Sequence, residues 1–170
     1  MRGRLRIRRD RRRGRGPRVA LAAVSMALVV LGPTVPAVGK VSPPSTLNGL
    51  RVAQEKVGKA PKSERQQFLT EIELFSLRQA NKQLEATIQV GKFLPGAPVG
   101  SLGFQREIAG QIGTTVPREQ RVDGVPVFVT KGKKLGIALW FRDGHIFILS
   151  IREGYGQPKT LIREALRMNP

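Results

Sequence analysis

The sequence has 170 residues, of which 40% are apolar and 5% aromatic, and it contains no cysteine and a single histidine. A chain of this length predicts one main folded domain. Its composition excludes disulfides, a catalytic thiol, cysteine-bound metal centres and any metal site built from several histidines of one chain. We therefore predict that the protein carries no metal and no cofactor.

The net charge of +18 is distributed unevenly along the chain. Residues 1–18 hold ten arginines and one aspartate, so this short segment carries +9, half of the total. So large a positive charge is typical of proteins that bind nucleic acid. One hypothesis is therefore a cytoplasmic nucleic-acid binder that uses the arginine-rich arm, although that hypothesis leaves the next segment unexplained.

An uncharged segment follows the arginines. Residues 19–32 read VALAAVSMALVVLG, and residues 33–39 read PTVPAVG. A basic start, an apolar stretch of about 7–15 residues and an exit of small residues are typical of a secretory signal peptide. The pattern allows cleavage after Ala37 or after Gly39. We therefore predict that residues 1–39 direct the rest of the chain out of the cytoplasm, which argues against nucleic acid as a partner.

The same segment also fits a membrane anchor that is never removed, because residues 19–38 are uncharged and about 20 residues span a bilayer. Pro33 and Pro36 disfavour helix in the last turns, which favours cleavage. Both alternatives predict an extracytoplasmic protein, either secreted or anchored to the plasma membrane. A lipid anchor at the cleavage site is excluded because the chain has no cysteine.

The segment after the signal is rich in proline, serine and glycine and has no apolar period. We predict that residues 40–61 form a flexible spacer in front of a folded domain over residues 62–170. The Ser-x-x-Gln pattern at Ser63 and the apolar residues after it predict a helix that runs to about Ile72. Residues 73–77 are predicted as a strand, with a continuation of the helix as the alternative.

The middle of the domain mixes strand and helix patterns. Residues 84–90 alternate between apolar residues and a polar side formed by Glu85, Thr87 and Gln89, which predicts a half-buried strand. Apolar residues spaced by four predict a short helix over residues 104–112, ended by Gly113. Residues 116–122 fit neither period, whereas residues 125–130 predict a strand.

The clearest local pattern covers residues 135–151, where two apolar runs flank Asp143 and Gly144. Asp-Gly between two such runs predicts a hairpin with a two-residue type I′ turn, and this turn places Trp140 opposite Phe147. Both faces of the hairpin are apolar, so both must be covered by other elements. Pro158 then predicts the first turn of a final amphipathic helix.

These elements predict an α+β fold. We expect a mostly antiparallel sheet of about five strands with helices packed on it, preceded by an N-terminal hydrophobic targeting helix.

The residues that could carry catalysis do not form a recognisable motif. His145, Asp143 and Ser150 have the residue types of a hydrolytic triad, but His145 directly follows the tight turn and is better explained as an exposed hairpin end. Carboxylates that could pair for glycoside hydrolysis are scattered along the chain: Glu71, Glu73, Glu85, Glu107, Asp123 and Asp143. An exported hydrolase that uses two of these acids is one alternative function.

Two sets of residues could bind a partner. Trp140 and Phe147 could face a ligand, although a core position is the ordinary role of such a pair. A basic bias in the middle of the domain comes from Arg106, Arg118, Arg121, Lys131, Lys133 and Lys134. For an exported protein the available polyanions would be acidic lipid head groups or anionic wall polymers.

Several strings in the chain resemble those of a known group of proteins: FSLR at residues 75–78, LEATIQVGKF at 84–93, IG at 112–113, WFR at 140–142 and LSIRE at 149–153. With them the chain resembles uncharacterised small exported or membrane-anchored proteins of high-GC actinobacteria. In its order of elements it is also similar to the Mog1/PsbP-like domains of actinobacterial lipoproteins, which implies an antiparallel sheet with helices on both sides. It lacks their lipid-bearing cysteine, and the resemblance implies no functional residue.

Together these observations predict an exported cell-envelope domain that is not an enzyme. We expect it to bind an unidentified protein, envelope component or small apolar ligand, and to meet the membrane during export or through its N-terminal anchor. The hydrolase and the nucleic-acid binder remain the alternatives, and the sequence does not specify the oligomeric state.

Overall fold

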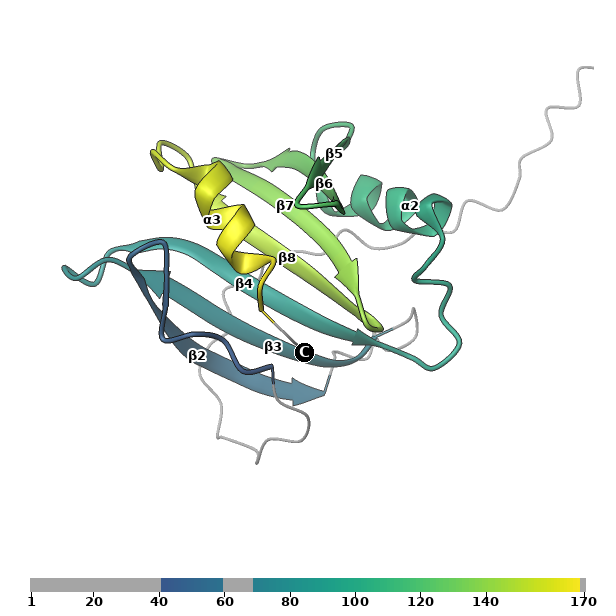
Figure 1. Cartoon of the computed structure of the whole chain (residues 1–170), viewed down its shortest axis with the longest axis horizontal. Coiled ribbons are helices and arrows are strands. Elements are labelled where there is room, and N and C mark those ends of the chain that lie inside the picture. The colour runs from purple at the N-terminus through teal and green to yellow at the C-terminus, as the bar shows by residue number, and fades with distance from the viewer. Residues whose placement is uncertain (1–40, 60–68, 169–170) are drawn as a thin grey trace, which may run out of the picture.

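The computed structural model describes residues 41–59 and 69–168 (Figure 1). Within these residues it has eight strands and two helices. The strands are β1 (Thr46–Leu47), β2 (Leu50–Lys59), β3 (Leu69–Arg78), β4 (Leu84–Phe93), β5 (Arg118–Val122), β6 (Val125–Gly132), β7 (Leu135–Arg142) and β8 (His145–Arg152). The helices are α2 (Leu102–Ile112) and α3 (Pro158–Ala165).

The described strands form one antiparallel sheet in the order β1-β2-β3-β4-β8-β7-β6-β5, which curves into a half-barrel. Each strand lies beside its neighbour in sequence except at the centre, where β4 pairs with β8. This long-range pairing joins two meanders, β1–β4 and β5–β8, into a single sheet. In Figure 1 α3 crosses one face of this sheet.

Each face of the sheet has its own hydrophobic core. On one face Leu161, Ile162 and Ala165 of α3 pack in a cluster with Trp140 and Phe147, whose rings stack with centroids 5.2 Å apart. On the other face, residues of α2 cover a second cluster that contains Leu139 and Ile148. Both apolar faces of the β7–β8 hairpin are therefore covered, one by α3 and the other by α2.

The hairpin itself was predicted correctly. Trp140 lies opposite Phe147, and Arg142 lies opposite His145, as a two-residue Asp-Gly turn requires. Asp143 and Gly144 both have positive φ, which identifies a type I′ turn. The helix ended by Gly113 is also confirmed as α2.

The predicted fold class was wrong. In place of an α+β domain with about five strands, the described residues form an eight-stranded antiparallel sheet with two short helices. The strands that the sequence patterns did not predict are β1, β2 and β5. The N-terminal targeting helix that formed part of the prediction falls in residues 1–40, which lie outside the described residues.

Two further expectations need correction. Residues 46–59 were expected to belong to a flexible spacer, but they form β1 and β2 around a turn at Asn48 and Gly49, both with positive φ. The helix expected from Ser63 to about Ile72 is replaced over residues 69–72 by the start of β3, which pairs with β2 and β4. The earlier residues of that expected helix lie outside the described residues.

Candidate anion-binding site

The aromatic pair expected as a possible ligand contact lies inside the protein. Trp140 and Phe147 are both fully buried and stack on one another within the core under α3. Neither side chain is accessible from the surface in this structure. The expected cleavage positions, Ala37 and Gly39, lie outside the described residues.

The residue types of a hydrolytic triad do not come together. The Nδ1 atom of His145 lies 2.8 Å from the backbone carbonyl of Asp143, at the hairpin turn. Ser150 is buried five residues further along the same strand, which places it about 17 Å away. Side chains separated by an odd number of strand residues also point to opposite faces of the sheet. His145 is therefore a hairpin-end residue as expected, but it is half-buried and not fully exposed.

The scattered carboxylates include two that are buried, Glu73 on β3 and Glu85 on β4. Glu73 pairs across the strands with Val90, five residues from Glu85 along β4, so the two acids are separated by about 17 Å. Glycosidases hold their two carboxyl groups about 5–9.5 Å apart. These two acids therefore do not form a catalytic pair of that kind.

Glu73 has its own local partners. Its carboxylate accepts a hydrogen bond from the backbone N–H of Val41 at 3.2 Å and another from the side-chain amide of Gln54 at 3.0 Å. Burial raises the pKa of Glu73, and these two hydrogen bonds oppose that rise without cancelling it. The carboxylate connects β2, β3 and the start of the described chain.

Glu85 is buried because of an irregularity in its strand. Leu77 pairs with Ala86, but the next residue of β3, Arg78, pairs with Leu84, so Glu85 is an extra residue on β4. Such a β-bulge changes the direction of a side chain and is common beside functional sites. The side chain of Glu85 is completely inaccessible to solvent, although the neighbouring Leu84 is 41% exposed.

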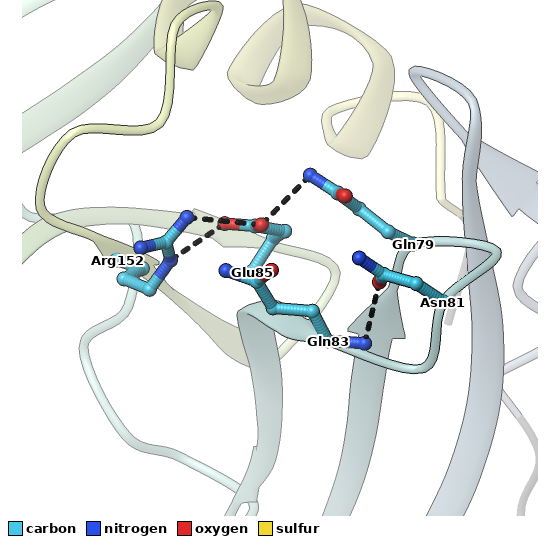
Figure 2. Close-up of polar contacts among 5 residues, drawn as sticks. All are labelled: Gln79, Asn81, Gln83, Glu85 and Arg152. Carbon is cyan, nitrogen blue, oxygen red and sulfur yellow. Dashed lines mark hydrogen bonds and ion pairs between the residues drawn. The ribbon is translucent and has the colours of Figure 1, made fainter.

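Three donors surround the buried Glu85 carboxylate (Figure 2). Arg152, the last residue of β8, donates from Nε at 2.8 Å and from Nη2 at 3.0 Å, and Gln79 donates from its amide at 2.8 Å. Gln79 is held by its own turn, where its backbone N–H bonds Gln83 and the Gln83 N–H bonds the Asn81 side chain. A buried carboxylate is stable only with such donors, because water no longer solvates it.

Arg152 has N–H donors that Glu85 does not use. A guanidinium carries five N–H groups, and Glu85 takes one from Nε and one from Nη2. Among the described residues, Nη1 has no acceptor, and 48% of the Arg152 side chain is exposed. Hydrogen bonding to Glu85 raises the pKa of Arg152, so the group stays charged. The free Nη1 and Nη2 donors form a fork that suits one phosphate or carboxylate.

The end of the sheet around Arg152 is strongly basic. We call it the cationic end; it is where β3, β6 and β8 finish and β4, β5 and β7 begin. Its described cations are Arg51, Arg78, Lys82, Arg118, Lys131, Lys133, Lys134 and Arg152. The turn at Lys134 lies next to Arg152, since the Lys134 carbonyl accepts from the N–H of Glu153 at 3.2 Å. The described acids at this end are Glu85, which Arg152 neutralises, Glu55, which pairs with Arg78 at 3.6 Å, and the exposed Glu153.

Sequence reasoning found part of this site. Of the basic residues singled out from the sequence, Arg118, Lys131, Lys133 and Lys134 meet at the cationic end. Arg106 instead pairs with Glu119 at 2.7 Å, and Arg121 donates to the carbonyl of Gly124 at 3.1 Å. Arg152 and the function of Glu85 were missed. The sequence marked Glu85 as one of several scattered carboxylates, and its place in an alternating strand assigned it to the solvent side.

No group of acidic or histidine side chains that could hold a metal ion occurs within residues 41–59 and 69–168. In the same part of the chain, no helix has the length and apolar character needed to cross a bilayer. Comparisons with protein-family models, curated proteins and solved structures found no match to this chain.

Proposed function

We propose that this chain is an exported, non-catalytic envelope protein whose folded domain binds an anionic group of an envelope component through Arg152. The anionic group is a phosphate or a carboxylate. Export is supported by the sequence of residues 1–39, which has the order of a secretory signal. Binding is supported by one observation above all, the buried Glu85 that holds one edge of the Arg152 guanidinium and leaves the other edge exposed.

A fixed guanidinium is a better anion receptor than a free one. An unrestrained arginine side chain loses rotational freedom when it binds a ligand, and this loss weakens the complex. Glu85 already fixes Arg152 in the unliganded protein, so less freedom remains to be lost. The planar fork then selects ligands with two oxygens in one plane.

The surrounding lysines support the same function. Lys131, Lys133 and Lys134 are exposed and lie beside the end of β8. Within about 8 Å at physiological salt, exposed charges act together on a ligand. They raise the local concentration of a polyanion and favour one with repeated negative groups.

The position of the aromatic pair favours a polar ligand over an apolar one. Trp140 and Phe147 contact each other face to face and are fully buried. An apolar ligand at this place would have to displace one of the rings from the core.

The proposal is tested by titrating the full chain with inorganic tripolyphosphate in a calorimeter. We expect Arg152→Lys to weaken binding about tenfold, because lysine keeps the charge but lacks the fork. Arg142→Lys is the matched control, since Arg142 is similarly exposed (43%), pairs with Asp143 and lies at the opposite end of the sheet. Equal affinities for the wild-type chain and Arg152→Lys, with both variants folded, would refute the proposal.

A further inference from the structure

The cationic end also carries exposed apolar side chains. Val116, in the loop before β5, is 87% exposed, and Leu84, the first residue of β4, is 41% exposed. Among the large apolar residues of the described chain, Val116 is the most exposed. Exposed apolar side chains among lysines are typical of surfaces that bind a lipid bilayer.

Both apolar residues lie close to the basic ones. The loop of Val116 is fixed to the β6–β7 turn, because the N–H of Thr114 donates to the Lys131 carbonyl at 2.7 Å and the N–H of Lys131 donates to the Thr115 hydroxyl at 3.1 Å. Leu84 directly precedes Glu85, the partner of Arg152. Val116 therefore lies on the lysine side of the cationic end, and Leu84 lies on the arginine side.

The two apolar residues lie on opposite sides of the basic ones. β4 and β5 are separated by β8, β7 and β6, so four strand spacings lie between Leu84 and the loop of Val116. At about 4.8 Å per spacing, this distance is about 19 Å along the end of the sheet. Lys133, Lys134 and Arg152 lie between them. A single small anion cannot reach residues spread over this distance, so the partner must be an extended anionic surface.

We infer that the anionic partner is the surface of an anionic lipid bilayer, which Leu84 and Val116 enter while the basic residues between them bind head-group phosphates. This inference rests on the proposed function and names its ligand. Charge complementarity favours this partner, since exposed cations outnumber exposed acids at this end of the sheet. The uncharged segment at residues 19–38 would bring the domain to the same surface.

The test labels single positions of the full chain with an environment-sensitive dye. The natural sequence has no cysteine, so Val116→Cys and Leu84→Cys each provide one attachment point. Leu94→Cys is the matched control, because Leu94 is 44% exposed but follows β4 at the opposite end of the sheet. The vesicles contain phosphatidylglycerol and phosphatidylcholine in equal parts, or phosphatidylcholine alone.

We expect the dyes at positions 116 and 84 to brighten and shift to shorter wavelength with the anionic vesicles and not with the neutral ones. The dye at position 94 should change with neither. Because every labelled chain retains residues 1–40, insertion of the N-terminal segment cannot produce this difference. We also expect Val116→Ser to weaken vesicle binding about tenfold without affecting tripolyphosphate binding, because it removes an apolar contact and leaves the charge unchanged.

The outcomes separate this inference from the proposed function. If tripolyphosphate binding depends on Arg152 but the dyes at 116 and 84 do not respond, the lipid inference is wrong and anion binding stands. Equal responses at positions 94 and 116 would also overturn the lipid inference. If the dyes respond to anionic vesicles while Arg152→Lys binds tripolyphosphate as the wild type does, the Arg152 site is wrong.

Discussion

Glu85 and Arg152 have unequal environments, and this difference determines what each contributes. The Glu85 side chain is fully buried, while nearly half of the Arg152 side chain remains in solvent. The ion pair therefore compensates mainly for the desolvation of the carboxylate. Its structural effect is to fix the direction of a charged group that solvent and ligands can still reach.

We expect Glu85→Gln to lower the free energy of unfolding by about 1–3 kcal/mol, because the amide loses charge-assisted hydrogen bonds and turns its own N–H groups toward those of Arg152. Glu119→Gln is the matched control, since Glu119 also accepts from an arginine but is 27% exposed. The free energy of unfolding of this control should fall by at most about 1 kcal/mol. Urea unfolding measures both, and equal losses would contradict the role given to burial.

The buried Glu73 should make the stability of the protein depend on pH. Burial raises its pKa above the ordinary value of 4.5, so the folded state binds the proton more tightly than the unfolded state. Its contribution to stability is therefore largest below that ordinary value and is lost as the pH rises through the raised pKa. We expect Glu73→Gln to be more stable relative to the wild type at about pH 7 than at about pH 4. Denaturant unfolding at the two pH values checks this, and a difference of the opposite sign would contradict it.

At the scale of elements, the tight turns determine the meander. Within the described residues, Asn48–Gly49, Asp123–Gly124 and Asp143–Gly144 each combine two residues of positive φ. A type I′ turn needs this conformation at both central positions, and its twist matches the twist of the strands. Each such turn therefore fixes which residues of the two strands face one another.

We expect Gly144→Ala to destabilise the protein by about 1–2 kcal/mol, because its φ of +74° is strained for any residue with a Cβ. The open space around Gly144 means that no clash contributes to this loss. Gly110→Ala is the matched control, since Gly110 lies inside α2 with equally open surroundings and should gain about 0.4–1 kcal/mol. Thermal unfolding of both variants tests this, and a loss of stability in both would contradict it.

One physical cause of the errors made from sequence is a break in the alternating pattern of a strand. The Leu-Asn-Gly-Leu string at residues 47–50 is itself a hairpin signal, but the strand after it does not keep an alternating pattern. In β2 the register shifts at Glu55, so the period-two pattern changes phase in the middle of the strand. The bulge at Glu85 causes the corresponding error in β4, since it moves a residue assigned to solvent into the interior.

The start of β3 shows a limit of a different kind. Apolar residues at helical spacing favoured a helix to Ile72, but Ile72 pairs with Gly58 on β2 and with Gly91 on β4. Pairing on both sides outweighs a local preference. By contrast, the β7–β8 hairpin follows from adjacent residues alone, and its register was predictable from Asp143 and Gly144. Arg152 lies at a strand end, where no local pattern marks its partner.

At the scale of the whole molecule, charge is sorted between the two ends of the sheet. The cationic end gathers the turns with Lys82, Lys133 and Lys134. At the opposite end the acidic turn residues pair with arginines, Asp123 with Arg163 at 3.4 Å and Asp143 with Arg142 at 3.4 Å. This sorting orients the domain in the field of an anionic surface.

The central claim is that Arg152 binds an anion while Glu85 holds it. The most direct measurement is the nitrogen-15 resonance of the Arg152 side-chain Nε–H in the labelled full chain during titration with tripolyphosphate. We expect a saturable shift of this resonance, with the Arg142 resonance unchanged. Equal shifts at Arg142 and Arg152, or no shift at Arg152, would contradict the account.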